Sequence, residues 1–301
     1  MILINKQLRD SKIFVSNQIM KSKISVVHLV YVPFGVDLFK RFLDSYVKHP
    51  SGIEHELIIM FNGFDKEDEL KQFLEIIDSL NLDYEVVLSK EKYDVSSYFF
   101  AAKNLNSEYL LFLNSYSMIL ADNWLHFFYS AMQKENVGVV GASGAGWRSD
   151  LKNFWEYNNS FGSVLKEIKS FIFIGLHFGK FVCPHVRTNS FFVRRDNFLL
   201  LKYNNILTAG SFKDSSADSK NKTLYFEHGN RNMTYQFIKM GLKTLVVDRY
   251  GNSYEPEDWM SSKTFWISNQ ENLLVHDNRT LMYENGDEKL RKELSYAAWG
   301  I

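Results

Sequence analysis

Polar and aromatic side chains gather at four points of the sequence where, or shortly after, an apolar run stops. The clusters are Tyr31-Val32-Pro33-Phe34, Phe61-Asn62-Gly63-Phe64-Asp65, Lys92-Tyr93-Asp94 and Asn114-Ser115-Tyr116-Ser117. Carboxamides and carboxylates hydrogen-bond base edges and ribose hydroxyls, and an aromatic ring or a proline can flank a base. The alternative is purely structural, with Asn62-Gly63 as a turn and Asp94 as a helix N-cap. If the runs are parallel strands, the clusters meet at one sheet edge, which favours a nucleotide site.

A carboxylate beside an imidazole is a second candidate for chemistry. Glu227 and His228 lie in the stretch Phe226-Glu227-His228-Gly229-Asn230-Arg231, where we expect a helix to open. Glu227 can serve as a general base. The alternative is that it caps this helix and complements the helix dipole.

Arg187 is a candidate for binding an anion. It precedes Thr188-Asn189 at the expected start of a strand, and a guanidinium matches the geometry of a diphosphate or an anionic acceptor. A solvated surface arginine is the alternative. His177, Cys183 and His185 follow no metal-binding template.

Two common nucleotide motifs are missing. The sequence has no Walker A loop and no G-x-G-x-x-G after its first expected strand, and "GASGAG" follows the fifth strand with the wrong spacing. ATP hydrolysis and dinucleotide redox chemistry are therefore disfavoured.

Composition sets the broad class. The chain has 301 residues, 46% of them hydrophobic and 23% charged, which excludes disorder as the default. Its 35 basic and 35 acidic residues balance, so nucleic-acid binding driven by charge is not expected. Cys183 is the single cysteine, which excludes an intrachain disulfide and suits a reducing compartment. We find no signal-peptide core and no membrane-spanning run, so a cytoplasmic location is expected.

The elements that must position these residues alternate between strand and helix. Apolar, β-branched runs predict strands at 25–32, 56–61, 84–88, 108–114 and 137–141. Helical spacing of apolar residues predicts helices at 36–48, 70–80, 95–104 and 124–132. This alternation predicts an α/β fold with a mostly parallel sheet covered on both faces.

The later half is predicted to be less regular. We expect a small-residue loop at 141–150, a helix at 153–173 and a strand at 187–194 with a helix behind it. A mobile polar loop at 208–222, a helix at 230–240 and a strand at 243–248 are expected to follow.

From about residue 24 to 248 the order of these elements resembles a GT-A glycosyltransferase, similar to glycosyltransferase family 2. In that family the first strand ends near the nucleotide, which implies donor binding by Val32, Pro33 and Phe34 in "VYVPF". Asn62, in "MFNGFD", stands where the family has an aspartate that contacts the base. Asp94, in "KYDVSSYFFAAKN", is the implied second base contact.

The resemblance places "LFLNSYSMILADNWL" on the family's Asp-x-Asp segment, which binds a divalent metal and through it the donor diphosphate. Asn114 and Tyr116 align with the two aspartates, so both carboxylates are missing. No metal ligand is therefore assigned. Mg²⁺ or Mn²⁺ remains an option only if the diphosphate and water hold it. Otherwise the resemblance leaves Asn114, Ser115, Tyr116 and Ser117 to bind the donor, helped by Arg187 or Arg231.

The family's catalytic base is the Asp of a Glu-Asp pair before a helix. "FEHGNRNMTYQFIKMGLKTLVV" matches that segment, so Glu227 and His228 fall on the pair and Glu227 is the remaining carboxylate. The resemblance also implies a division of the chain. Residues 1–250 form the transferase domain, with a donor half at 24–145 and an acceptor half at 146–250 that includes Arg187 and Asn189. Residues 251–301 are a C-terminal extension packed on the same domain, as a lid or acceptor-side cap.

The implied function is transfer of a hexosyl or deoxyhexosyl group, with inversion, from a UDP- or dTDP-linked donor to a glycan or lipid-linked glycan. Bacterial surface polysaccharide synthesis (O-antigen or capsule) is the implied setting. The apolar stretch at 171–181 is either a buried core helix or a peripheral contact with the inner face of the plasma membrane. Two rivals remain, a degenerate glycan- or nucleotide-binding module and a sugar nucleotidyltransferase. The second usually needs a basic, glycine-rich loop, and "YVPFGVD" has no basic residue.

Overall fold

The computed structural model describes residues 22–147, 182–203 and 215–301. The helix predicted at 153–173 and the apolar stretch at 171–181 lie outside these described residues. So do residues 148–150 and 208–214 of the two predicted loops.

A mixed sheet forms the centre of the fold, and its strand order is β11-β10-β6-β9-β4-β1-β2-β3. Its strands are β1 (Ile24–Tyr31), β2 (Glu56–Asn62), β3 (Glu85–Leu88), β4 (Tyr109–Leu113), β6 (Val137–Gly141), β9 (Ser190–Arg194), β10 (Lys243–Val247) and β11 (Ser253–Tyr254). The pairs β1–β2, β2–β3, β1–β4 and β6–β10 are parallel, so the prediction of a mostly parallel α/β sheet is confirmed. β9 runs antiparallel between β4 and β6.

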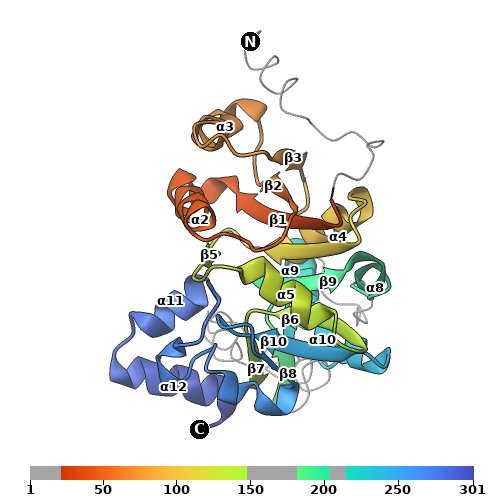
Figure 1. The fold of residues 1–301 in the computed structure, drawn as a ribbon, viewed down its shortest axis with the longest axis vertical. Coiled ribbons are helices and arrows are strands. Elements are labelled where there is room, and N and C mark those ends of the chain that lie inside the picture. Colours follow the sequence, from red (N-terminus) through yellow and green to blue (C-terminus); the bar gives the residue numbers. More distant parts are fainter. Residues whose placement is uncertain (1–21, 148–181, 204–214) are drawn as a thin grey trace, which may run out of the picture.

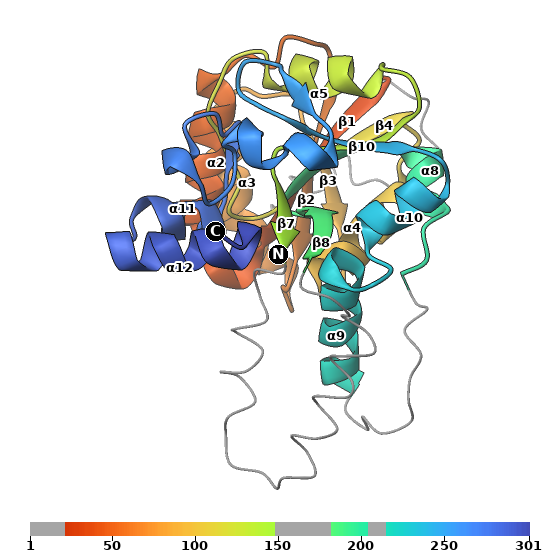
Figure 2. The same cartoon turned by 90° about the horizontal axis from the view of Figure 1, so that it is seen from below.

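Helices cover both faces of this sheet. The helices α2 (Val36–Lys48), α3 (Lys71–Asp78) and α5 (Trp124–Met132) pack on one face. The other face carries α4 (Asp94–Asn104), α8 (Arg195–Leu199), α9 (Ser215–His228) and α10 (Met233–Lys239). Figures 1 and 2 both show α2 and α3 on the side of the first strands opposite α4. Strands buried on both faces favour apolar residues at nearly every position, which explains the long apolar runs of the sequence.

Three local predictions were wrong. Part of the loop expected at 141–150 is β7 (Gly144–Trp147), which pairs antiparallel with β8 (Val182–Val186). The strand expected at 187–194 begins only at Ser190, because residues 187–189 form the turn that leads from β8 into β9.

The third error concerns α9, where residues 215–222 were predicted to be a loop and Glu227 to open a helix. Instead Glu227 lies in the last turn of α9, and α10 follows with Asn232 as its N-cap. The polar composition of α9 hid its helical state. The helix is held by tertiary packing at its end, where the Phe226 ring lies 5.6 Å from that of Phe99.

The C-terminal residues build a further layer beside the sheet. Its elements in the described chain are η3 (Pro256–Asp258), η4 (Met260–Ser262), η5 (Ser268–Gln270), β12 (Val275–His276), α11 (Asn278–Glu284) and α12 (Glu288–Trp299). Earlier in the chain lie three short elements, η1 (Val32–Phe34), η2 (Glu67–Leu70) and β5 (Met118–Ile119). β12 pairs antiparallel with β5, and α11 and α12 share a small apolar core with β7. Within the described ranges, no helix is both long and apolar enough to cross a membrane.

His28 in the centre of β1 generates a prediction about stability. Its ring is fully buried, stacks 3.6 Å from the Phe42 ring, and has no hydrogen-bond partner among the described residues. Burial lowers the pKa of His28 from 6.5 to about 3. The stability linked to neutral His28 is present above pH 6.5 and is lost as the pH falls toward 3.

We expect His28→Phe to be more stable than the wild type, and the gap to widen by about 2 kcal/mol between pH 7.5 and pH 5. Urea unfolding at the two pH values measures this gap. A gap that does not change with pH would contradict the assignment.

Candidate active site

A cavity of about 470 Å³ opens at the carboxyl edge of the parallel strands. It is bounded by the ends of β1, β2 and β4, the start of α4, the turn after β8, the end of α9 and residues 277–279. Ten of the predicted site residues line it: Phe34, Asn62, Asp94, Asn114, Ser115, Tyr116, Arg187, Asn189, Glu227 and His228.

Four predicted residues do not line this cavity. Val32 is buried in η1, and Pro33 beside it is exposed. Ser117 is fully buried below the turn that follows β4. Arg231 is exposed between α9 and α10, so the structure offers no support for a role of its guanidinium in this cavity.

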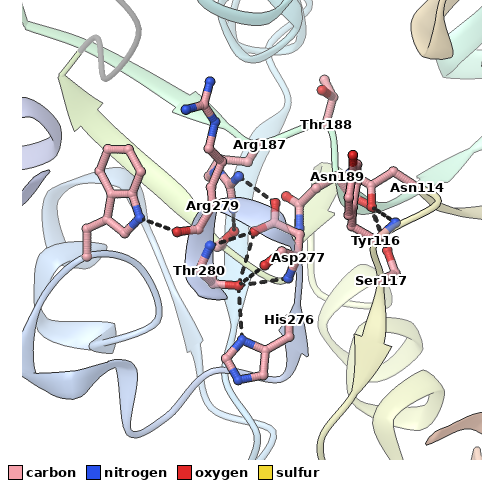
Figure 3. A network of polar contacts seen from close by, with 12 residues as sticks. Asn114, Tyr116, Ser117, Arg187, Thr188, Asn189, His276, Asp277, Arg279 and Thr280 are labelled. Carbon is pink, nitrogen blue, oxygen red and sulfur yellow. Dashed lines mark hydrogen bonds and ion pairs between the residues drawn. The ribbon is translucent and has the colours of Figure 1, made fainter. Parts of the chain in front are cut away.

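The Asn114–Ser117 segment is a turn held by hydrogen bonds between its own residues. Asn114 Oδ1 accepts hydrogen bonds from the Tyr116 amide at 3.0 Å and the Ser117 hydroxyl at 3.2 Å, as Figure 3 shows. The Ser115 hydroxyl donates to the Leu29 carbonyl and accepts from the Tyr31 amide. Both serine hydroxyls therefore hold the fold together. The expectation that they also bind a ligand stays a prediction.

Aromatic rings form one wall of the cavity. The Phe34 ring lies 4.9 Å from that of Tyr31 and 5.0 Å from that of Tyr116. Phe34 remains 45% exposed, so a flat ligand has access to it. Gly63 makes room for this wall, because a Cβ at its φ of +74° would lie 2.3 Å from the Tyr31 ring.

Asn62 and Asp94 lie on the next side of the cavity. Asn62 Nδ2 donates to the Ser97 hydroxyl at 2.7 Å. Asp94 is the first residue of α4, after the N-cap Tyr93, and its Oδ1 accepts from the Val95 amide at 2.8 Å. Burial raises the pKa of the Asp94 carboxyl, while its own hydrogen bonds and the charge of His228 act against the rise.

Glu227 and His228 lie side by side at the end of α9, on the wall of the cavity. The Thr188 hydroxyl donates to Glu227 Oε1, and His228 Nε2 lies 3.7 Å from Glu227 Oε2. The two side chains are 16% and 14% exposed, so they are sheltered but reachable. The His185 ring lies 5.1 Å from that of His228, and His185 Nδ1 donates to the Cys183 carbonyl, which places a proton on Nδ1.

Arg187 is committed to an ion pair with a residue 90 positions away. Its guanidinium lies 2.5 Å from Asp277 Oδ2, with 11% and 1% of the two side chains exposed. It also stacks 4.1 Å above the Phe265 ring. Asp277 in turn caps α11 by accepting from the Thr280 amide at 2.8 Å. This pair brings Arg279, a lining residue, to the cavity (Figure 3).

Sequence reasoning missed Thr188, Asp277 and Arg279. Thr188 stands one position from a predicted residue, but its contact with Glu227 crosses 39 positions. The other two lie in the segment that the sequence left as a guessed lid. Their signal is a charged "HDNR" run after an apolar stretch, which alone does not distinguish a site from a solvated turn.

Asn114 and Tyr116, which the sequence resemblance aligned with an Asp-x-Asp motif, do not fit a metal held by the protein. Asn114 supplies a single carbonyl oxygen, and that oxygen already accepts two hydrogen bonds. A phenol at Tyr116 is no substitute for a carboxylate. Across the described ranges we find no group of three His, Cys, Asp or Glu side chains placed to hold a metal ion.

Comparison with known proteins gives only distant likenesses. The chain matches no protein-family model and no curated protein. A mannosyltransferase from Pyrobaculum calidifontis, in complex with GDP-Man and Mn²⁺, is similar over 52% of this chain and 44% of its own, at 12% identity and a TM-score of 0.33. Glucosyl-3-phosphoglycerate synthase from Mycobacterium tuberculosis is similar over 57% of this chain and 56% of its own, at 13% identity and a TM-score of 0.34.

A 4-diphosphocytidyl-2C-methyl-D-erythritol synthase from Anaerococcus prevotii gives 74% of this chain and 87% of its own, at 13% identity and a TM-score of 0.40. This chain spans less than half the length of the mannosyltransferase. At such low identities and scores the likenesses assign no activity to the chain.

The Arg187–Asp277 pair generates the second prediction. Asp277→Asn keeps an N-cap for α11 but leaves a buried guanidinium without its counter-charge, so we expect the free energy of unfolding to fall by about 3 kcal/mol. Lys292→Gln, which breaks the exposed Lys292–Glu288 pair, is the control and should cause no measurable change. Equal effects of the two variants in urea unfolding would contradict the importance of the buried pair.

The raised pKa of Asp94 generates the third prediction. Stability linked to this carboxyl is fully present below its ordinary value of 3.8 and is lost as the pH rises through its pKa in the folded protein. Asp94→Asn removes this loss and keeps an oxygen for the Val95 amide. We therefore expect the variant to gain stability relative to the wild type between pH 4 and pH 7. Thermal unfolding measures the stability of Asp94→Asn minus that of the wild type. A difference that stays constant or falls between pH 4 and pH 7 would contradict the raised pKa of Asp94.

Proposed function

We propose that this chain is a glycosyltransferase of the GT-A type, which moves a sugar from a nucleoside diphosphate to a hydroxyl group of a glycan. One observation carries the proposal. Glu227, hydrogen-bonded by Thr188 and next to His228, shares a single cavity with the aromatic wall of Phe34 and Tyr116. A base and a surface for ring stacking are the two parts that such a transfer needs in one place.

The donor nucleotide is assigned to the side of the cavity formed by β1, β2 and α4. Phe34 and Tyr116 offer ring faces for the base. Asn62 and Asp94 offer oxygens and an amide for its edge, which suits uracil or thymine and hence a UDP- or dTDP-linked donor.

The leaving diphosphate needs stabilisation of its growing negative charge. Asn114 Oδ1 is occupied by the turn, so its Nδ2 group is the part of this side chain that serves as a donor. Lys92 and Arg279 line the same cavity and supply positive charge. Arg187 contributes chiefly by holding Asp277, and with it the segment that carries Arg279.

Glu227 is proposed to act as the general base. It takes the proton of the acceptor hydroxyl while that oxygen bonds to the anomeric carbon, and the bond from this carbon to the diphosphate oxygen breaks. The electron pair leaves with the diphosphate, and the proton remains on Glu227. Attack from the face opposite the leaving group inverts the anomeric centre. Thr188 and His228 orient the carboxylate.

The biological setting is proposed from the family resemblance. It comprises a hexosyl or deoxyhexosyl donor, a glycan or lipid-linked glycan acceptor, and synthesis of a bacterial surface polysaccharide such as O-antigen or capsule. Such an acceptor would bring the protein to the cytoplasmic face of a membrane.

A second candidate is a degenerate binding module that holds a nucleotide or glycan without transfer. It is supported by the absence of carboxylates from the Asn114–Ser117 segment, which the family resemblance aligns with the Asp-x-Asp motif. Against it stands the sheltered Glu227–His228 pair, which a binding module does not need.

Glu227→Gln separates the two candidates and is the fourth prediction. We expect slow hydrolysis and transfer of UDP- and dTDP-sugars to fall by about 10²-fold or more, because the proton acceptor is lost while the shape remains. The thermal shift caused by the same donors should remain, since the carboxylate does not hold the nucleotide.

Glu257→Gln, an exposed carboxylate in η3, is the control and should behave as the wild type. The thermal shift should also survive EDTA, because the described residues place no group of three His, Cys, Asp or Glu side chains to hold a metal ion. Donor binding without hydrolysis or transfer in the wild type would favour the binding module. Loss of donor binding in Glu227→Gln would overturn the assignment of the base.

A further inference from the structure

The turn between β8 and β9 delivers three consecutive side chains to the cavity. Arg187 pairs with Asp277, Thr188 donates to Glu227, and Asn189 follows as the third lining residue. In Figure 3 the Asn189 side chain lies between Asp277 and the Asn114 turn. Its backbone carbonyl is bound to the Asn114 turn, and the preceding residue, Thr188, donates to Glu227, so Asn189 connects these two parts of the site.

The carboxamide of Asn189 is buried without a partner. The residue is only 5% exposed, and neither Oδ1 nor Nδ2 forms a hydrogen bond within the described chain. Its backbone is held in place, since the Asn189 carbonyl accepts from the Asn114 amide at 3.0 Å and from the Ser117 hydroxyl at 3.3 Å. Buried polar groups normally find a partner, so an orphan carboxamide that lines a cavity indicates a ligand.

The chemistry of a carboxamide defines which ligand group completes it. It needs a donor for Oδ1 and an acceptor for Nδ2. A phosphate oxygen only accepts, and it would be repelled by Oδ1. Two neighbouring hydroxyls of a sugar satisfy both atoms, because one hydroxyl donates to Oδ1 and the other accepts from Nδ2.

We propose that Asn189 recognises a pair of hydroxyls on the sugar that is being transferred, and so helps to determine which donor sugar is accepted. This assignment rests on the proposed transferase function and replaces the looser acceptor or diphosphate role expected from the sequence. The donor sugar is chosen over the acceptor because the Asn189 carbonyl is tied to the Asn114 turn, on the diphosphate side. Thr188, the preceding residue, holds the base on the opposite side.

The ligand-free protein provides the first test. Asn189→Leu keeps the branching at Cγ and removes two unsatisfied groups, so we expect the melting temperature to rise by about 2 °C. Asn232 is the matched control, because it is equally buried but donates to Cys183 Sγ and accepts from the Tyr235 amide. Asn232→Leu should lower the melting temperature. A fall with Asn189→Leu as well would overturn the claim that its carboxamide lacks a partner.

The second test compares a nucleotide sugar with its own nucleoside diphosphate. The wild type is screened by calorimetry against UDP-glucose, UDP-galactose, UDP-N-acetylglucosamine and dTDP-rhamnose, and the tightest donor is used. Asn189→Leu should bind this donor about tenfold more weakly and should bind UDP or dTDP as the wild type does. If Asn189→Leu weakened the binding of free UDP or dTDP as much as that of the nucleotide sugar, Asn189 would be assigned to the diphosphate and the proposal would be overturned.

An analogue of the same donor that lacks one sugar hydroxyl completes the cycle. For each analogue we measure the loss of affinity in the wild type and in Asn189→Leu. Removal of one particular hydroxyl should weaken binding to the wild type but should leave binding to Asn189→Leu almost unchanged. Additive losses at every hydroxyl would overturn the proposal while leaving the transferase function intact. If no nucleotide sugar binds the wild type, the transferase function and this inference both fail.

Discussion

The buried ion pair between Arg187 and Asp277 ties together the parts of the molecule that form the cavity. Arg187 begins the turn that carries Thr188 and Asn189, and Asp277 begins the helix that carries Arg279. The pair is nearly inaccessible to water, so each charge depends on the other for compensation. Because Thr188 in this turn also hydrogen-bonds Glu227, the position of the Glu227 carboxylate depends indirectly on a contact with the C-terminal segment.

The elements of the sheet were predictable because their cause is local. β1, β2, β4 and β6 are continuous apolar runs, and α2 has a regular apolar face, so their bounds were predicted to within about a residue. α9 was not predictable in this way. Its first residues are polar, and what holds it is the packing of Phe226 near its end. The antiparallel course of β9 likewise depends on pairing with β4 and β6, which no local pattern reveals.

The candidate site shows the same division. Polar residues directly after buried strands, such as Asn62 and Asn114, could be found from the sequence because parallel strands end at a common edge. The hydrogen bonds that each of these residues makes could not be predicted from the sequence. Ser115 and Ser117 read as free hydroxyls in the sequence, yet both are used by the backbone around them. Asp277 and Arg279 reach the cavity through a contact that spans 90 positions, for which spacing provides no signal.

The pairing of β12 with β5 also has a consequence for synthesis of the protein. All strands of the central sheet precede residue 255, whereas the segment that walls the cavity beside Asn189 begins at Val275. During synthesis every strand of the central sheet is therefore made before Asp277, the counter-charge of Arg187. Residues 277–279 line the cavity, so its wall can be complete only after this late segment has been made, whereas the sheet needs none of it.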